Sequence, residues 1–330
     1  MGKYCYRNNR GVALILVLMI IAIIVVVTLD FNSEMRSDFT AAANVRDSIR
    51  LRCVAKSGFD YALDVLTEDA DKNDFDTLQE DWANADVLSK GVSSLEGLAG
   101  IRLEVIDCER KIQINSLKLG EVGFDLLDRF LSLQEFDLDP ETVKDMEYSL
   151  IDWIDTNDLE SDDMYGAEDA YYQSQDPPYA CNNGPVRSIT SLRKVKGFKD
   201  IPQETFDKIV KHLTPYGEDK INLNTADPLI LQALDDRITQ NLADQMDAYR
   251  QDEEHNLSLA SITWYENIPD MVDIVIDKDL ITTQSSFFWI SSTASITVGE
   301  GKELLTKRVT GVVMRKPGEK DIDLLSWRVE

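Results

Sequence analysis

An unbroken apolar segment near the start of the chain constrains its architecture more than any other feature. It runs from Val12 to Leu29 with Thr28 as its only polar residue, and Asp30 ends it. As a helix these residues span about 27 Å, close to the hydrocarbon thickness of a bilayer. Basic residues precede the segment and acidic residues follow it, which predicts a single membrane span with the N-terminus in the cytoplasm.

Three interpretations of this segment compete. A secretory signal peptide is disfavoured because the apolar run is long and no small-residue cleavage site follows it. A plain single-pass anchor agrees with the hydropathy. The third interpretation also explains why Arg10 and Gly11 stand before the run, since a short basic leader ending in Gly is similar to the signal of type IV prepilins. That resemblance implies that prepilin peptidase removes residues 1–11 and leaves Val12 as the mature N-terminus.

Two positions depart from the usual pilin pattern. Mature pilins usually begin with Phe, so Val12 is an unusual substrate for the N-methylation expected of this class. Pilins also usually carry Glu at the fifth mature position, where this chain has Leu16. A carboxylate inside a membrane is costly unless it is paired, and in pilins its expected partner is the terminal amine of the next subunit. Leu16 therefore suggests a subunit with no neighbour above it, at the tip of a filament.

The charge balance argues against one class of function. The chain has 34 Lys and Arg against 60 Asp and Glu, a net charge of −26, which becomes −29 once the three bases of the leader are removed. A nucleic-acid-binding protein normally presents a basic face to the phosphates. We therefore expect no nucleic-acid partner.

Beyond the membrane segment, the period of the apolar residues changes twice. Helical spacing continues to about Leu66, in one helix with the anchor, and helical patterns also fill residues 116–279. Gly299-Glu300-Gly301 predicts a hairpin near the end of the chain. Apolar–polar alternation predicts strands at 101–106, 111–115 (returning after a turn), 287–298, 302–315 and 324–329.

This order of elements predicts an α+β protein in which a helical insert interrupts one sheet domain. The expected parts are a leader at 1–11, a transmembrane and amphipathic helix at 12–66, a sheet domain from 67–115 and 280–330, and an inserted helical domain at 116–279.

Two similar segments, Lys111–Ser116 and Lys220–Thr225, each lead from a short alternating stretch to a helix N-cap pattern. We interpret them as related strand-to-helix entries. The second segment and Ser191–Phe198 resemble helix-hairpin-helix DNA-binding modules, but the net charge favours a packing unit.

The densest acidic segment, Asp152–Asp176, holds nine acids and no Lys or Arg. Gly166 and the following Pro177-Pro178 pair predict a loop, and interleaved aromatic residues indicate that it is packed. Carboxylates in an ordered loop repel one another unless a cation neutralises them, and Ca²⁺ accepts about six to eight oxygen ligands in flexible geometry. Because no EF-hand spacing is present, a calcium site and a solvated acidic loop both remain open at this point.

Signals for catalysis are absent from the sequence. His212 and His255 are isolated, and no phosphate-binding, dinucleotide-binding or nucleophile-elbow motif occurs. We therefore expect no enzymatic activity. Three cysteines would remain after cleavage, Cys53, Cys108 and Cys181, so at most one intramolecular disulfide can form, and its pairing is open.

A series of short motifs resembles the minor pseudopilin K family of type II secretion systems (general secretion pathway protein K). In chain order they are Arg10–Met19, Asn44–Asp47, Ser149–Asp155, Gly166–Asp169 with Tyr171 and Tyr172, Pro177–Tyr179, Ser191–Arg193 and Ile221–Ala226. The resemblance covers essentially the whole chain, and the missing Glu at the fifth mature position is typical of the family.

The resemblance implies a type IV pilin-like fold, with a long N-terminal helix on an antiparallel sheet and a large helical domain inserted between strands. It implies an inner-membrane protein with its bulk in the periplasm, which joins minor pseudopilins I and J at the tip of the pseudopilus. There it would initiate pseudopilus assembly for the export of folded exoproteins. The resemblance also implies Ca²⁺ in the helical domain, with Asp155, Asp158, Asp162, Glu168 and Asp169 as ligands.

Two other functions remain open from the sequence. One is a minor pilin that primes a surface type IV pilus or a DNA-uptake filament. The other is an uncleaved, membrane-anchored periplasmic binding domain.

Overall fold

The fold is described from a computed structural model, which places residues 10–93, 100–298, 303–316 and 322–330. Helix α1 (Arg10–Ala70) is a single 61-residue helix, because no proline interrupts the sequence from the apolar segment onward. It ends one turn beyond the predicted Leu66. The predicted hairpin at Gly299-Glu300-Gly301 lies outside the described residues.

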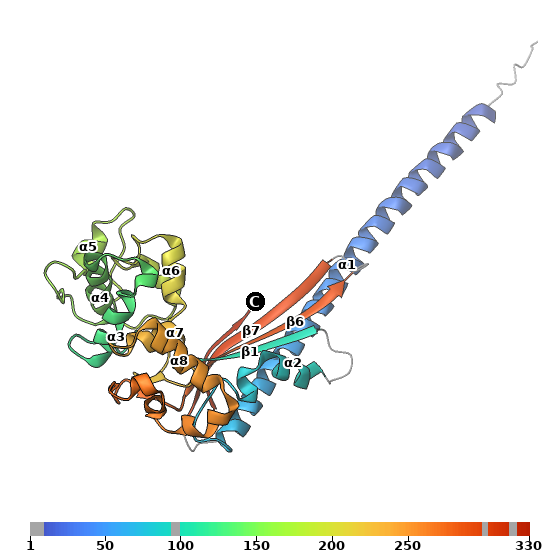
Figure 1. The fold of residues 1–330 in the computed structure, drawn as a ribbon. Helices are drawn as coiled ribbons and strands as arrows, with labels where there is room; N and C mark the ends of the chain where they lie inside the picture. Colours follow the sequence, from blue (N-terminus) through green and yellow to red (C-terminus); the bar gives the residue numbers. More distant parts are fainter. Residues whose placement is uncertain (1–9, 94–99, 299–302, 317–321) are drawn as a thin grey trace, which may run out of the picture.

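Only the C-terminal third of α1 belongs to a hydrophobic core. Leu51, Phe59 and Leu66 are buried against the sheet, whereas the helix N-terminal to Asp47 extends away from the domain with exposed side chains (Figure 1). The helical spacing at Phe39 and Val45 therefore does not mark a face buried within this chain, since both side chains are exposed.

Four antiparallel strands form the sheet against which α1 packs. They lie in the order β1-β6-β7-β8, so that the first strand pairs with the strand that follows the insert. The arrangement confirms the expected α+β class, a long N-terminal helix on an antiparallel sheet. The bounds are β1 (Gly100–Asp107), β6 (Phe287–Val298), β7 (Glu303–Arg315) and β8 (Ile322–Val329).

Two short helices after α1 complete this core. Trp82 lies in the 3₁₀-helix η1 (Asp81–Ala83), is fully buried, and meets Phe288 of β6 edge to face with ring centroids 5.3 Å apart. Helix α2 (Ala85–Ser93) contributes Leu88 and Val92 to the same core. Residues 71–93 thus close the end of the core that α1 and the sheet leave open.

Glycine allows α1 to lie close to the sheet. A Cβ atom on Gly58 would lie 2.5 Å from both Cδ1 of Ile101 and Oγ of Ser292. A Cβ atom on Gly311 of β7 would lie 2.7 Å from the carbonyl oxygen of Ser326 and 2.9 Å from Cζ of Phe59. Both approaches are shorter than side-chain carbons tolerate, so a larger residue would push the helix and sheet apart.

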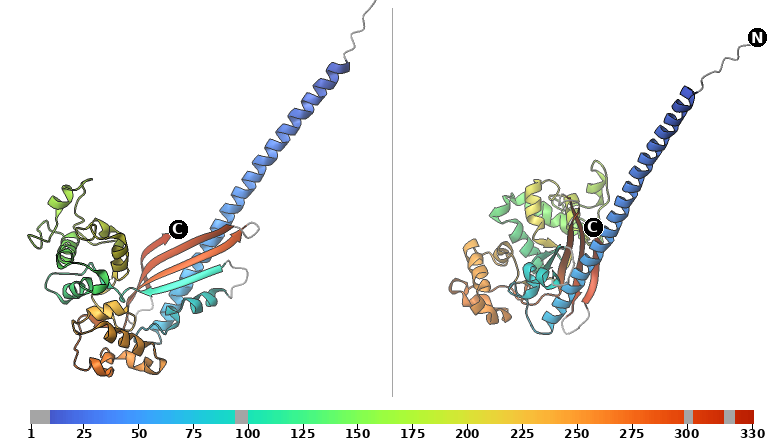
Figure 2. Two further views of the ribbon diagram at one scale, coloured as in Figure 1. Left: turned by 45° about the horizontal axis from the view of Figure 1, so that its top comes forward. Right: turned by 90° about the vertical axis from the view of Figure 1, so that its right-hand side faces the viewer.

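The insert has its own hydrophobic core, separate from the core under α1, and lies at the end of the sheet farther from the N-terminus (Figures 1 and 2). Each half of the insert is closed by a pair of two-residue parallel strands, and we call these halves the first lobe (112–214) and the second lobe (221–282). The first lobe contains β2 (Ile112–Gln113), α3 (Val122–Leu131), η2 (Gln134–Phe136), α4 (Pro140–Ile154), α5 (Asp169–Gln173), η3 (Ile189–Lys194), α6 (Gln203–Val210) and β3 (Leu213–Thr214). The second contains β4 (Ile221–Asn222), α7 (Pro228–Ala233), α8 (Gln240–Gln251), η4 (Glu253–Ala260), η5 (Trp264–Asn267), η6 (Pro269–Met271) and β5 (Ile281–Thr282).

The prediction that residues 111–115 return alongside the strand at 101–106 was wrong. Ile112 and Gln113 pair in parallel with Leu213 and Thr214, not with β1. Alternation marks a segment as a strand but does not identify its partner, and here the partner lies about a hundred residues away. The helical insert therefore begins before residue 112, at the turn that follows β1.

The two similar segments in the sequence open the two lobes. In the first, the backbone N–H of Asn115 donates to the side chain of Gln113, and in the second the N–H of Asn224 donates to Asn222 Oδ1 at 2.9 Å. Each segment pairs with a strand that ends in Thr214 or Thr282. The predicted N-caps were misplaced, because the helices begin later, after Glu121 in the first lobe and after Asp227 in the second.

A buried polar network holds the second lobe on the sheet. Oδ2 of Asp107, at the end of β1, accepts hydrogen bonds from Asn222, Thr225 and Ser285. Burial raises the pKa of Asp107, and the hydrogen bonds from these groups oppose that shift. The Ile221–Ala226 motif therefore has a structural role, since its Asn and Thr side chains satisfy a buried carboxylate.

Candidate metal centre and membrane anchor

The acidic segment forms the connection between α4 and α5 at the outer end of the first lobe. Helix α4 begins at Pro140, where the carboxylate of Asp139 caps the N–H groups of Glu141 and Thr142. Its last turn buries Asp152 and Trp153, so the chain enters the loop with one carboxylate already inside the protein. Trp153 also meets Tyr172 of α5 edge to face at 4.9 Å, which explains the packed, aromatic character of the loop.

Three carboxylates converge beneath this loop. Asp152, Asp155 and Glu168 each offer an oxygen atom, and these atoms lie within 4.8 Å of one another. Asp152 and Glu168 are buried and Asp155 is half-buried. Asp152 accepts hydrogen bonds from the backbone N–H groups of Ser161 at 2.8 Å and Ala167 at 2.7 Å. Asp152 therefore organises the loop and also borders the cluster.

The environment of the Glu168 carboxylate favours a bound cation. Both of its carboxylate oxygens are buried, and no N–H or O–H donor among the described residues reaches either one. Burial raises the pKa of Glu168 to about 7, with a smaller contribution from the charges of Asp152 and Asp155, although a hydrogen bond from the Cys181 thiol opposes the shift. A buried carboxylate without N–H or O–H donors is unfavourable unless it is protonated or bound to a cation.

The nearest described basic side chain holds the loop without neutralising the cluster. Nζ of Lys196 pairs with Asp145 at 2.9 Å and donates to the carbonyl oxygens of Met164 and Tyr165. Lys196 thus pairs with a carboxylate of α4, and among the described residues no basic side chain forms an ion pair with the three converging carboxylates.

Of the five predicted ligands, the structure brings Asp155 and Glu168 together. The other three have ordering roles in the loop: Asp158 accepts from Asn183 Nδ2 at 2.7 Å, Asp162 caps the N–H groups of Met164 and Tyr165, and Asp169 accepts from the N–H of Cys181. Asp152 was missed as a ligand candidate. Asp152 lies in the last turn of α4, where residues 149–154 are all buried, and its place within the apolar stretch Leu150–Ile154 is the signal that marks it as buried.

Gly166 permits the close contacts of the loop. A Cβ atom at this position would lie 2.6 Å from Oδ2 of Asp152 and 2.7 Å from the carbonyl oxygen of Asp162. Its N–H also donates to that carbonyl at 2.9 Å. A side chain at position 166 would therefore displace a carboxylate of the cluster.

A second trio of acids, Asp69, Asp76 and Glu80, lies at the end of α1. Here a cation of the protein is already in place, because Nη1 of Arg315 pairs with Asp69 at 3.1 Å and Nη2 pairs with Asp76 at 2.5 Å. Glu80 also accepts from the N–H of Thr77 and from the indole of Trp82. This trio is a buried ion-pair network rather than a candidate metal centre.

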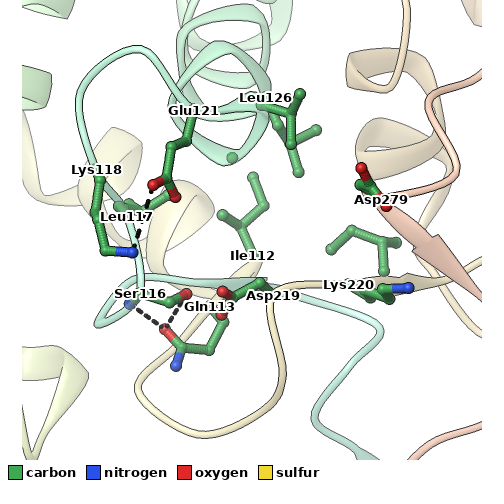
Figure 3. Close-up of a pocket in the computed structure, with 13 residues that line it drawn as sticks. Ile112, Gln113, Ser116, Leu117, Lys118, Glu121, Leu126, Asp219, Lys220 and Asp279 are labelled. Carbon is green, nitrogen blue, oxygen red and sulfur yellow. Dashed lines mark hydrogen bonds and ion pairs between the residues drawn. The ribbon is translucent and has the colours of Figure 1, made fainter.

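A pocket of about 210 Å³ lies where the two lobes meet (Figure 3). Its charged residues are mixed in sign, with Lys118 paired to Glu121 at 3.4 Å and Lys220 flanked in the sequence by Asp219. The side chain of Gln113 on its floor accepts hydrogen bonds from Ser116. Lys118 is thus paired with Glu121, and Ser116 with Gln113, among the residues that line this pocket.

The histidines serve as packing residues. His212 meets Phe130 edge to face with ring centroids 5.5 Å apart, and His255 stacks on Tyr249 at 3.9 Å.

The three cysteines that the structure describes, Cys53, Cys108 and Cys181, are free thiols.

The N-terminal part of α1 is the only described helix that is long and apolar enough to cross a membrane. Its most apolar 18-residue window has a mean hydropathy of 3.5, and none of it is buried inside the protein. Gly11 and Val12 lie in its first turns, and Leu16 is 55% exposed. The helix thus presents an unpartnered apolar surface along its first half.

Comparison with known proteins identifies the family. The family model described as type II secretion system protein K matches residues 113–216, which is almost the whole first lobe. A putative type II secretion system protein K of Escherichia coli K12 is 28% identical over 227 residues, 66% of either chain. The protein K of Aeromonas hydrophila is 25% identical over 237 residues, 67% of this chain and 69% of that protein.

A solved structure shows the same fold. It is described as the GspK-GspI-GspJ complex from the type 2 secretion system of enterotoxigenic Escherichia coli, and the match has a TM-score of 0.65 at 18% identity. It covers 88% of this chain and 99% of that one. Together with the sequence matches, this places the chain in the type II secretion system protein K family, the minor pseudopilins of that system.

Proposed function

We propose that this chain is the pseudopilin at the tip of a periplasmic pseudopilus, where it starts assembly together with minor pseudopilins I and J. Two observations support this proposal. The sequence matches protein K of type II secretion systems, and the anchor helix has the apolar residue Leu16 at the fifth mature position. The related solved structure is described as a complex with GspI and GspJ, which supports these two partners.

The exposed first half of α1 supports a move from membrane to filament. Phe39, Val45 and Ile49 lie C-terminal to the membrane segment and are exposed, although all three are apolar. Neighbouring subunit helices would bury these side chains together with the membrane segment once the helix leaves the bilayer. For Phe39, Val45 and Ile49, which lie outside the membrane segment, this burial contributes about 25 cal/mol per Å² of apolar area removed from water. The membrane segment exchanges one apolar environment for another and gains no such contribution.

Processing of the leader distinguishes this function from a static anchor. The chain is to be co-expressed with prepilin peptidase, purified in detergent and sequenced from its N-terminus. We expect the mature chain to begin at Val12, and a Gly11→Val variant to keep its leader. An intact leader in the unaltered chain would favour the static membrane-anchored binding domain.

Co-purification separates the pseudopilin from a pilus primer. The mature chain should purify with minor pseudopilins I and J of its own system, and with no minor pilins of a surface pilus. Genomic neighbours of the secretion-pathway type would support the same conclusion, whereas a stable complex with type IV pilus components would contradict it.

We also propose that the carboxylates of the acidic loop bind Ca²⁺. Two ligands on opposite sides of Ca²⁺ lie at most about 5 Å apart, since each Ca²⁺–oxygen distance is about 2.4 Å. The spacing within 4.8 Å of the Asp152, Asp155 and Glu168 oxygens agrees with that limit. The buried carboxylate oxygens of Glu168, which no N–H or O–H donor of the described residues reaches, also support the proposal.

Thermal unfolding and calorimetry of the full chain in detergent test the calcium proposal. A free Ca²⁺ concentration a hundred times the dissociation constant stabilises the folded state by about 2.7 kcal/mol relative to chelator. Glu168→Gln should abolish this effect. Asp163→Asn, in the same loop but exposed and outside the cluster, should retain it. No heat of binding and no shift with Ca²⁺ would reject the site.

A further inference from the structure

A row of side chains crosses the sheet on the face that points away from α1. Ile106, Trp289, Val312 and Ser326 lie directly opposite one another on the four strands. Their neighbours Val105, Ile290 and Val313 belong to the core under α1, and successive side chains of a strand point to opposite faces. The row is therefore the outer surface of the sheet, and it is mostly apolar.

The first lobe forms the opposite wall and turns this surface into a cleft of about 450 Å³. Ile189 and Val210 of the lobe, and Tyr216 just after it, line the cleft together with the row. The volume lies within the range of about 300–1,000 Å³ that is usual for binding pockets. We call this space the basic cleft, because every charged residue that lines it is Lys111, Arg187 or Arg328.

A lining without any acid is unexpected in this protein, whose acids outnumber its bases by 60 to 34. Lys111 is half-buried, and burial together with the charge of Arg110 lowers its pKa. Within the described residues no carboxylate forms an ion pair with Lys111 or Arg187, and Arg328 has only Glu330 at 3.7 Å. Lys111 and Arg187 are therefore two cations of the cleft with which no carboxylate of the described residues pairs.

We propose that the basic cleft binds an extended, acidic segment of another polypeptide. Carboxylates of the segment would pair with Lys111 and Arg187, and an apolar side chain would cover Trp289. Three inter-strand spacings make the row about 14 Å long, the length of four or five extended residues. A small inorganic anion would leave the apolar row uncovered, and a long polyanion would meet the negative field of the rest of the molecule.

Fluorescence anisotropy with the full chain in uncharged detergent tests the proposal. The probe is a fluorescein-labelled octapeptide in which glutamate and leucine alternate, compared with the same peptide carrying glutamine for glutamate. We expect saturable binding of the acidic peptide only. Raising the salt from 50 to 500 mM should weaken it, since the contacts are between partly exposed charges.

A pair of matched variants locates the binding. Arg187→Glu should weaken the acidic peptide at least tenfold. Arg102→Glu makes the same charge change at an exposed position on the same face of the sheet but outside the cleft, and should leave binding unchanged. Circular dichroism melts of both variants verify folding.

Three results would overturn the proposal: no saturable binding up to 1 mM peptide, equal weakening by both variants, or equal binding of the glutamine peptide. Binding of polyphosphate or anionic vesicles at the cleft, with no competition from the acidic peptide, would also overturn it in favour of a different ligand. This inference does not depend on the pseudopilin function.

Discussion

Arg315 and Asp76 form a buried ion pair across 239 positions of the sequence, with Nη2 and Oδ1 2.5 Å apart. Arg315 stands at the end of β7, and Asp76 lies in the turn after α1. The same guanidinium reaches Asp69 on the last turn of α1 and lies over the ring of Phe288. One side chain thus joins the helix, the following turn and the sheet where the insert is attached.

Removal of this cation should destabilise the sheet domain strongly. Arg315→Met keeps much of the apolar stem but leaves two carboxylates without their partner, and breaking a buried pair in this way typically costs about 3–5 kcal/mol. Denaturant unfolding followed by circular dichroism measures the loss. Arg308→Met, an exposed position on the same strand, is the control and should change stability little. Equal stability of the two variants would show that the ion pair contributes nothing net.

The junction between sheet and insert should make stability depend on pH through Glu109. Burial, and then the charge of Asp107, raises the pKa of Glu109 to about 8. Because the folded state holds the proton more tightly than the unfolded chain, this contribution is complete below about pH 4.5 and is lost as the pH rises to about 8. Stability should therefore fall across that range.

Glu109→Gln removes this one titration. The unfolding free energy of the variant should rise relative to that of the unaltered chain between pH 5 and 8, by up to about 1.4 kcal/mol per pH unit. Glu104→Gln, at an exposed position on the preceding strand β1, should give a constant difference. A Glu109→Gln difference that is equally constant would mean that Glu109 is ionised throughout this range in the folded protein.

Local patterns in the sequence were sufficient to predict the long helix and the long strands. The apolar run, the helical spacing through Leu66 and the alternation at 287–298 and 302–315 each report on a single element and its buried face. The α+β class followed from their order. The pairing of Ile112 with Leu213 did not follow, because a partner a hundred residues away is set by how the insert packs and not by local periodicity.

The composition of the acidic loop indicated a candidate metal centre, but the sequence did not predict which carboxylates come together. Nine acids without a base marked the loop, and Glu168 and Asp155 were among the expected ligands. The contribution of Asp152 depends on which face of α4 is buried, and the ordering roles of Asp162 and Asp169 depend on backbone turns. The cations of the basic cleft lie on three separated segments, so only the folded chain brings them together.

The fifth mature position offers a direct test of the tip assignment. In a subunit without a neighbour above it, a carboxylate at position 16 has no amine to pair with and costs about 2.5–3.5 kcal/mol in the membrane. Leu16→Glu should therefore be tolerated or harmful in an exoprotein secretion assay, and no better than Leu18→Glu, two positions further along the helix. Improved secretion with Leu16→Glu alone would contradict a tip position.

Gly166 should be required for the calcium response more than for folding. The Cβ of Gly166→Ala would approach Oδ2 of Asp152 to 2.6 Å, so either that carboxylate or the loop must shift. Because Asp152 receives the N–H groups that fix both ends of the loop, the shift should also move Glu168 away from Asp155. We expect the variant to fold and to lose most of its stabilisation by Ca²⁺.

Gly184→Ala is the matched control, since a Cβ there meets only the carbonyl oxygen of Asn182, at 3.8 Å. The difference in melting temperature between Ca²⁺ and chelator, measured for each variant, separates the two effects. A loss confined to Gly166→Ala would place the ion beside Asp152. If Gly166→Ala keeps the full calcium response, or if both variants lose it equally, the ion does not bind beside Asp152 and the three-carboxylate site is refuted.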